Sequence, residues 1–333
     1  MQGGIKPDLF AAVGNTPLIR IPRLSGALGR NILGKCEHLN PGGSVKDRAA
    51  KFIIEAAERD GSLQPGGTIV EGTAGNTGIA LALLGNARGY RTIIVVPDDQ
   101  APEKFELLRI FGADVRAVPV VPFADDNNYY HVARHIAGQT RGAIWADQFN
   151  NPANKEAHYR TTGPEIWEDS GGSIDAFVSA AGTGGTYAGV CAYLKERDPR
   201  VRCVLVDPLG SSLYAYIKCG TLDVEGESVI EGIGIKRITE NFKGAPADDA
   251  LRVEDRAAVE MAHYLLREEG LWLGGSAALN VVAAARVSKA CPAGATVVTI
   301  FGDGGARAMS RLYNEQWLAE NDLTPTARGL EFL

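Results

Sequence analysis

Short apolar runs rich in valine and isoleucine alternate along the chain with longer segments of helical periodicity, and this alternation constrains the fold most. Gly, Pro or Asp bounds each short run, as is common for strands. The strand candidates are residues 32–36, 68–71, 92–96, 115–118, 176–180, 202–206 and 296–301. The helix candidates are residues 47–59, 78–89, 102–111, 129–139, 184–196, 254–269 and 277–289. Strands that alternate with helices form βαβ units, so we expect an α/β fold of mainly parallel, twisted sheets flanked by helices.

Composition excludes several classes of protein. The 333 residues correspond to about two domains at roughly 150 residues each. The 34 Lys and Arg residues against 40 Asp and Glu residues give a net charge of −6, which argues against nucleic acid or an anionic membrane as partner. No apolar run reaches the ~18 residues that a membrane helix needs. The N-terminus also lacks the basic start and apolar core of a signal peptide.

Neither the cysteines nor the histidines indicate a metal site. The five cysteines include no C-x-x-C pair, which favours neither a disulfide framework nor a zinc site and fits a reducing cytoplasm. His131 and His135 lie one helical turn apart, which is the spacing of a metal-binding face. Their segment reads HVARH, without the Glu of a metalloprotease, so we expect solvated or core histidines and no metal.

Ligands of open α/β sheets bind at the carboxyl ends of the strands, so the loops after the strand candidates are where a site is expected. The loop NPGGSVKDR at 40–48 holds Ser44 and Asp47 in an S-x-x-D capping pattern, which places Lys46 in the first turn of a helix. The positive end of the helix dipole and partial burial would favour a neutral amine, able to form a Schiff base. The alternative is a solvated surface lysine after a turn.

A second loop, GTGGT at 182–186, predicts an anion site. Its glycines let backbone N–H groups approach a phosphate, and the following helix adds its dipole. A tight strand-to-helix turn is one alternative. A dinucleotide fingerprint is another, with Asp207 as the ribose-binding acid, but Tyr187 stands where the third glycine of that motif belongs.

A third loop, TAGNTG at 73–78, is short and rich in side-chain donors. Thr73, Asn76 and Thr77 supply those donors, while Gly75 allows a close backbone approach. Such a loop suits a carboxylate better than a phosphate, although a helix cap explains it equally well.

Taken together, these loops resemble one family. NTPL (Asn15–Leu18), NPGGSVKDR, TAGNTG, QFNNPAN (148–154), GTGGT and EGIGI (Glu231–Ile235) occur in that order. The chain resembles the cysteine synthase (O-acetylserine sulfhydrylase) and cystathionine β-synthase family of pyridoxal-phosphate enzymes of fold type II. The resemblance implies a two-lobed, tryptophan synthase β-like fold. Residues 41–152 would form a smaller, mobile lobe with the substrate-carboxylate loop, and residues 1–40 plus 153–333 a larger lobe that binds the cofactor phosphate.

The resemblance also implies a role for each matching residue. Lys46 would hold pyridoxal 5'-phosphate as a Schiff base and then act as base and acid at the substrate α-carbon. The other cofactor-binding residues would be Asn76 at the ring hydroxyl, Gly182, Thr183, Gly184, Gly185 and Thr186 at the phosphate, and Gly304 beside the ring. The substrate-binding residues would be Thr73, Ala74, Gly75, Thr77 and Gln148 at the carboxylate, with Gly232 and Gly234 at the mouth of the site.

The implied reaction is β-replacement, in which O-acetylserine loses its α-proton and acetate to give an aminoacrylate, and sulfide adds to give L-cysteine. Cystathionine formation, cysteine desulfhydration and diaminopropionate synthesis pass through the same intermediate, so Lys46 does not distinguish them. A non-catalytic binding protein is disfavoured because Lys46, Asn76 and Gln148 are all present. The family also suggests a homodimer and, in some members, a complex with serine acetyltransferase.

The chain departs from the family pattern at two positions. Many cysteine synthases have Ser where Ala74 stands, and family members commonly place a Ser against the pyridine nitrogen where Gly304 stands. Water or the adjacent Asp303 could replace that hydroxyl. Successive residues after a strand point in opposite directions, so we expect Asp303 to face away and water to contact an unprotonated nitrogen.

Overall fold

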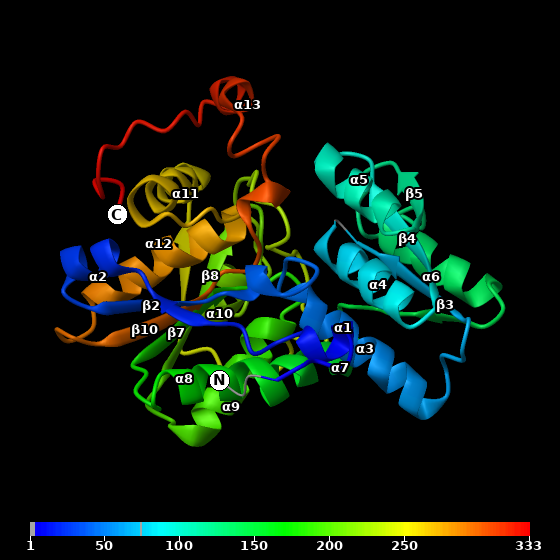
Figure 1. Cartoon of the computed structure of the whole chain (residues 1–333). Helices are drawn as coiled ribbons and strands as arrows, with labels where there is room; N and C mark the ends of the chain where they lie inside the picture. The colour runs from blue at the N-terminus through cyan, green and yellow to red at the C-terminus, as the bar shows by residue number, and fades with distance from the viewer. Residues whose placement is uncertain (1–3, 74) are drawn as a thin grey trace.

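In the computed structural model, which describes residues 4–73 and 75–333, the chain forms two sheets flanked by helices (Figure 1). The larger sheet has the strand order β1 (Leu18–Arg20), β2 (Asn31–Lys35), β10 (Thr296–Ile300), β7 (Ala176–Ala180), β8 (Arg202–Pro208) and β9 (Asp249–Val253). The smaller sheet has the order β5 (Asp114–Val118), β4 (Arg91–Pro97), β3 (Thr68–Gly72) and β6 (Ala143–Trp145). All neighbouring strands are parallel except β1 and β2, so the predicted α/β fold with mainly parallel sheets is confirmed.

The helices connect the strands in the expected alternation. The main helices are α3 (Lys46–Asp60), α4 (Asn76–Ala87), α5 (Pro102–Ile110), α6 (Tyr129–Gln139), α9 (Gly185–Arg197), α11 (Asp255–Glu269) and α12 (Gly275–Lys289). Shorter helical segments are α1 (Leu9–Ala12), α2 (Pro22–Leu28), η1 (Glu37–Leu39), α7 (Pro152–Ala157), η2 (His158–Thr162), α8 (Gly163–Asp169), α10 (Leu213–Cys219), η3 (Gly305–Arg307) and α13 (Glu315–Glu320). Every strand and helix expected from the sequence is present, with ends that differ by at most two residues.

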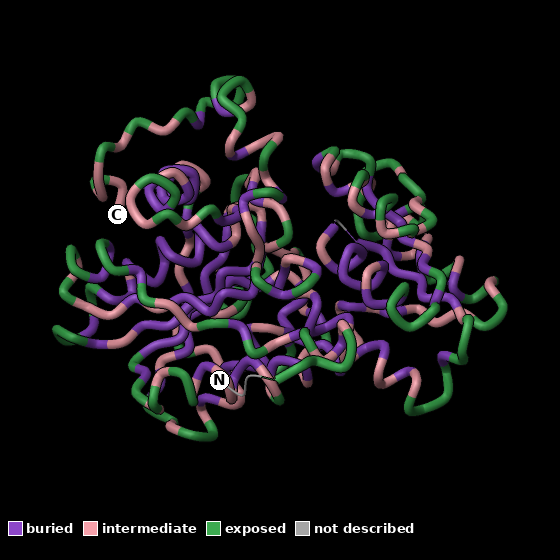
Figure 2. The backbone as a smooth tube through the Cα atoms, viewed as in Figure 1, coloured by how far each residue is buried: buried purple, intermediate pink, exposed green. Residues whose placement is uncertain are grey.

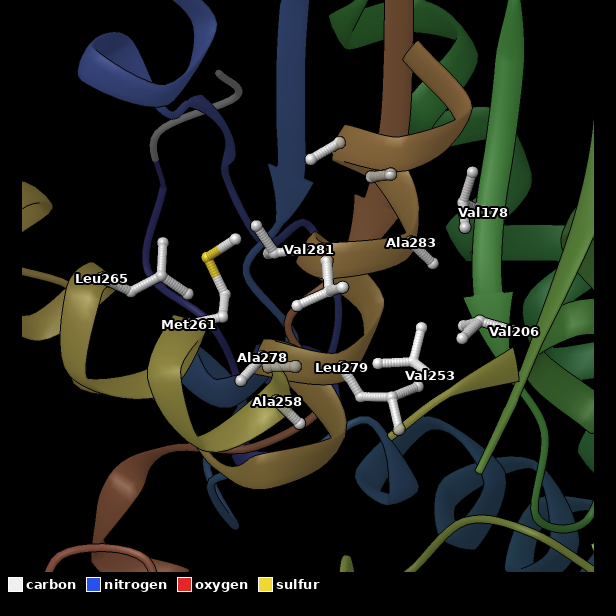
Figure 3. Close-up of a cluster of buried hydrophobic side chains, with 14 of the residues drawn as sticks. Val178, Val206, Val253, Ala258, Met261, Leu265, Ala278, Leu279, Val281 and Ala283 are labelled. Carbon is white, nitrogen blue, oxygen red and sulfur yellow. The ribbon is translucent and has the colours of Figure 1, made fainter. Parts of the chain in front are cut away.

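The largest core lies between the larger sheet and the helices α11 and α12 (Figure 3). Val178, Val206 and Val253 project from three neighbouring strands toward α12. The small side chains of α12, among them Ala278 and Ala283, let this helix lie buried between the sheet and α11. Figure 2 shows the same pattern along the chain, with buried strands inside and exposed loops outside. Such close packing on both sides fixes the carboxyl ends of the strands, where the site is built.

The start of α3 differs from the expected capping box. Val45 is the N-cap, and the Ser44 hydroxyl lies one residue earlier, where it accepts the Lys46 N–H at 3.2 Å. The Asp47 carboxylate accepts the N–H of Gly42 and does not return to Ser44. Asp47, which the sequence pattern assigned to the cap, therefore binds the glycine turn instead. Lys46 still lies in the first helical turn, as predicted.

Three further features concern the whole chain. Across residues 4–73 and 75–333, no helix is both long and apolar enough to cross a membrane. Cys219 is exposed and the other four cysteines are buried, and all five are free thiols. His131 lies on α6, and its Nε2 is 2.7 Å from the carbonyl oxygen of Phe123.

Candidate active site

The carboxyl ends of strands from both sheets meet around one cavity of about 210 Å³. Thr73 follows β3 of the smaller sheet, while Gly182 and Asp303 follow β7 and β10 of the larger sheet, and all three residues line the cavity. An adjoining recess of about 50 Å³ shares Lys46 and Asn76 with it. The location agrees with the expectation that ligands of parallel sheets bind at this edge.

Most of the residues singled out in the sequence lie around these two hollows. Those lining the larger cavity are Lys46, Thr73, Gly75, Asn76, Thr77, Gln148, Gly182, Thr183, Gly232 and Gly234. Gly184 and Thr186 line the recess, and Gly185 lies behind it against Asn154. Ala74 falls outside the described residues. The structure thus brings these residues together, and the ligand that each one contacts stays a prediction.

Lys46 is the first residue of α3 and borders both hollows. Burial lowers the pKa of its ammonium, and the nearby Asp303 carboxylate opposes that shift only in part. A lowered pKa increases the share of neutral amine at pH 7, which is the form that attacks a carbonyl carbon. The environment of Lys46 therefore suits Schiff-base chemistry better than a solvated surface position would.

The GTGGT loop adopts a conformation that only glycine tolerates at its centre. Gly184 has φ +86°, and a Cβ there would lie 2.5 Å from the Cβ of Phe242. The loop opens directly into α9, whose first N–H groups have no partner within the helix. Together with the Thr183 and Thr186 side chains, these donors lie around the recess in an arrangement that suits an anion.

Residues outside the loop hold its two threonines. Asn154 donates from Nδ2 to the Thr183 hydroxyl at 2.9 Å. The Nε2 atom of His158 lies 3.1 Å from the Thr186 hydroxyl oxygen. Burial, with further contributions from the charges of Arg48 and Lys46, lowers the pKa of His158 well below its usual value, so the imidazole is neutral. Sequence reasoning had assigned no role to His158, because a lone histidine in a helix carries no signal.

The TAGNTG loop is tied to Gln148 by side-chain bonds. The Thr77 hydroxyl donates to Gln148 Oε1, and Gln148 Nε2 donates to Glu71 Oε1 at 3.1 Å and to the Gly72 carbonyl at 3.3 Å. Thr77 and Gln148, which the resemblance assigns to the substrate carboxylate, therefore already have protein partners for these side-chain donors. One of these partners is Glu71, a fully buried carboxyl that sequence analysis missed, whose pKa is raised well above its usual value by burial and then by Asp147.

The expected direction of Asp303 is wrong. Asp303 lines both hollows, and its carboxylate accepts a hydrogen bond from Asn76 Nδ2 at 2.7 Å. A Cβ at Gly304 would point elsewhere, 3.9 Å from the Cβ of His38 and 3.9 Å from the Trp272 carbonyl oxygen. The side-chain positions of residues 303 and 304 do point in opposite directions, but it is Asp303 that lies toward the hollows. The backbone of this segment pairs with residues 44 and 273, and that pairing decides which of the two residues does so.

Polar contacts join segments that are far apart in the sequence, and three of the residues involved line the cavity. Lys104 on α5 forms an ion pair with Glu231 at 2.6 Å, and Arg311 contacts the other oxygen of Glu231 at 3.1 Å. The Ser310 hydroxyl donates to Glu103 at 2.8 Å. Sequence reasoning missed this cluster, although Glu231, the unassigned acid of the EGIGI segment, was a signal for it.

Comparisons with known proteins give matches that cover most of the chain. The profile of a family described as "Pyridoxal-phosphate dependent enzyme" matches residues 9–303. Cysteine synthase 1 of Neurospora crassa is 49% identical over 325 residues, which cover 96% of this chain and 86% of that protein. The crystal structure of an O-acetylserine dependent cystathionine beta-synthase from Helicobacter pylori has a TM-score of 0.85 and 35% identity, and the alignment covers 93% of this chain and 99% of that one. The crystal structure of O-ureido-L-serine synthase has a TM-score of 0.86 and 33% identity, covering 95% and 100%.

Proposed function

Because the chain belongs to the family of pyridoxal-phosphate-dependent enzymes, we propose that it makes L-cysteine from O-acetylserine and sulfide by β-replacement. One observation carries this proposal beyond family membership. A lysine with a lowered pKa, a glycine-rich loop at a helix N-terminus and a donor-rich loop border the same two hollows. An aldehyde, a phosphate and a substrate carboxylate require those three kinds of group.

The residues present fit pyridoxal phosphate. Lys46 offers the amine for its aldehyde, and Asn76, whose Oδ1 is buried and without a partner among the described residues, offers an amide to the ring hydroxyl. The GTGGT loop offers a backbone surface that a Cβ at Gly184 would distort. When bound, the cofactor supplies the electron sink that lets an amino acid lose its α-proton.

The residues of the chain have separate roles in the proposed reaction. Lys46 is placed to hold the cofactor and to move the α-proton of the substrate. Thr73, Thr77 and Gln148 line the cavity and would orient the substrate carboxylate, for which Thr77 and Gln148 would exchange their present hydrogen bonds. The Lys104–Glu231 ion pair joins two segments of the cavity lining.

The proposal is tested by assaying amino-acid products. The purified protein is loaded with pyridoxal phosphate and given O-acetylserine with sulfide, and the cysteine formed is measured. In parallel reactions O-phosphoserine, serine or cysteine replaces O-acetylserine, and the products are compared. Sulfide is then replaced by homocysteine. We expect cysteine from O-acetylserine and sulfide at the highest kcat/KM. A preference for homocysteine would indicate a cystathionine synthase, the activity for which the similar Helicobacter pylori enzyme is named, and would contradict the proposal.

We also propose that residues 41–152 move as the smaller lobe and close over the substrate. The smaller sheet in this range supports that division, because it is built of its own four strands. Family resemblance further suggests a homodimer and, as in some members, a complex with serine acetyltransferase, and the cysteine pattern fits a cytoplasmic location. Sedimentation of the purified protein, alone and with a serine acetyltransferase, tests both assemblies, and a monomer that ignores the second protein would contradict them.

A further inference from the structure

We propose that the carboxylate of Asp303 contacts the pyridine nitrogen of bound pyridoxal phosphate, in place of the serine hydroxyl common in the family, and keeps that nitrogen protonated. The inference rests on the cofactor site proposed above. It concerns a residue to which neither the family resemblance nor the comparisons give a role. Three features carry it: the fixed backbone of Asp303, the position of its carboxylate, and the charges around it.

The backbone of Asp303 is held on two sides. It pairs with Ser44, two residues before Lys46, and the Val45 N–H donates to the Gly302 carbonyl at 2.8 Å. On the other side, the N–H of Gly274 donates to the Asp303 carbonyl at 3.1 Å. Asp303 is therefore fixed relative to the loop that carries Lys46, and its side chain has a defined direction.

The carboxylate lies at the end of the site expected to hold the cofactor ring. It accepts the Asn76 amide at 2.7 Å, and Asn76 is the residue assigned to the ring hydroxyl. Asp303 lines both hollows and follows β10, while Thr183 and Gly184 of the phosphate loop follow β7. The room for the carboxylate exists because residue 274 is glycine, since a Cβ there would lie 2.1 Å from Asp303 Oδ1.

Two basic side chains and one competing hydroxyl lie near the Asp303 carboxylate. Asp303 raises the pKa of both Lys46 and Arg307, each against a larger effect of burial. Ser276 also lines the recess, and its hydroxyl lies 3.1 Å from the position a Cβ at Gly302 would take. A neutral hydroxyl leaves a pyridine nitrogen neutral, whereas a carboxylate stabilises the pyridinium. A contact with Asp303 and a contact with Ser276 therefore predict different protonation states of the pyridine nitrogen, which can be measured.

The first experiment is ¹⁵N NMR of the protein loaded with pyridoxal phosphate labelled at the ring nitrogen. Wild type and Ser276→Ala should both show the resonance of a protonated nitrogen, while Asp303→Asn and Asp303→Ser should show that of a neutral one. Wild type with a neutral nitrogen would overturn the inference, and so would a resonance that changes with Ser276→Ala and not with the Asp303 variants. Circular dichroism establishes that each variant is folded.

The second experiment is a binding cycle that does not depend on catalysis. Pyridoxal phosphate and its analogue with CH in place of the ring nitrogen are titrated into wild type and Asp303→Asn. Loss of a hydrogen bond to a charged group should weaken pyridoxal phosphate binding about 10- to 100-fold in the variant and leave the analogue's affinity nearly unchanged. An equal loss for both ligands would overturn the inference. If wild type binds no pyridoxal phosphate at all, the proposed function fails as well; if it binds with a neutral nitrogen, only the role of Asp303 fails.

Discussion

Replacing Arg48 by Met should strongly destabilise the protein, because Arg48 is the centre of a buried ion-pair network beside the lysine loop. Arg48 exposes 1% of its side chain and Glu37 exposes none. The guanidinium donates to both oxygens of Glu37 at 2.7 Å and to both oxygens of Glu165 at 2.6 and 2.7 Å. Glu165 keeps Lys35 at 2.9 Å in the variant, whereas Glu37 loses its guanidinium partner inside the protein. Leaving one charge of a buried pair uncompensated costs about 3–5 kcal/mol, and that is the expected loss in free energy of unfolding.

Urea unfolding at pH 7 measures this loss, provided that the m value stays constant. Glu37→Gln combined with Arg48→Met should destabilise the protein less than the sum of the two single variants, because the double variant leaves no charge unpaired. Arg160→Met is the matched control, since its ion pair with Glu156 is exposed and contributes about 0.3–0.5 kcal/mol. A loss below about 1 kcal/mol for Arg48→Met, or additive single variants, would refute the reasoning.

Three further outcomes are expected. Gly184→Ala should weaken cofactor binding in a pyridoxal phosphate titration and lower the free energy of unfolding by about 1–3 kcal/mol, because the new Cβ meets Phe242 at 2.5 Å; unchanged affinity would place the phosphate elsewhere. If Gln148 turns to the substrate carboxylate, Gln148→Ala should raise the KM for the amino-acid donor and raise the activation free energy of the first half-reaction by about 1–3 kcal/mol. An unchanged rapid-mixing trace would remove Gln148 from the site. Burial favours a raised pKa for Glu165, but the hydrogen bonds and charge of Arg48 lower it to about 2. Its stabilisation is therefore complete above the ordinary value of 4.5 and disappears as the pH falls toward 2, so acid unfolding of Glu165→Gln should be less steep than that of wild type.

The elements that sequence analysis predicted are those with strong periodicity. α6 (Tyr129–Gln139) and β7 (Ala176–Ala180) were predicted to the residue, since a helical pattern or a short apolar run marked each of them. β6 (Ala143–Trp145) is three residues long and β9 (Asp249–Val253) is an edge strand with two charged residues, so neither showed a strand pattern. These short strands are stabilised by pairing with neighbours, and local sequence does not reveal it.

The candidate site likewise has features that the sequence predicted and features that it did not. The GTGGT and TAGNTG loops were predicted because glycines and hydroxyl residues at fixed spacing carry a local signal. Contacts between distant segments were missed: Lys104 meets Glu231 across 127 positions, and Gln148 meets Glu71 across 77. The direction of Asp303 depends on pairing with such a segment, so the alternation rule alone gave the wrong sense.

The central claim is that the half-buried Lys46 binds the cofactor, and that no buried lysine does so. Lys35 and Lys104 are buried, but both are engaged with carboxylates, at 2.9 and 2.6 Å. The protein is loaded with pyridoxal phosphate, reduced with borohydride and digested, and the labelled peptide is identified by mass spectrometry. We predict the phosphopyridoxyl group on Lys46 alone and none in Lys46→Ala. A label on Lys35 or Lys104, or a folded protein that takes up no label, would contradict the account.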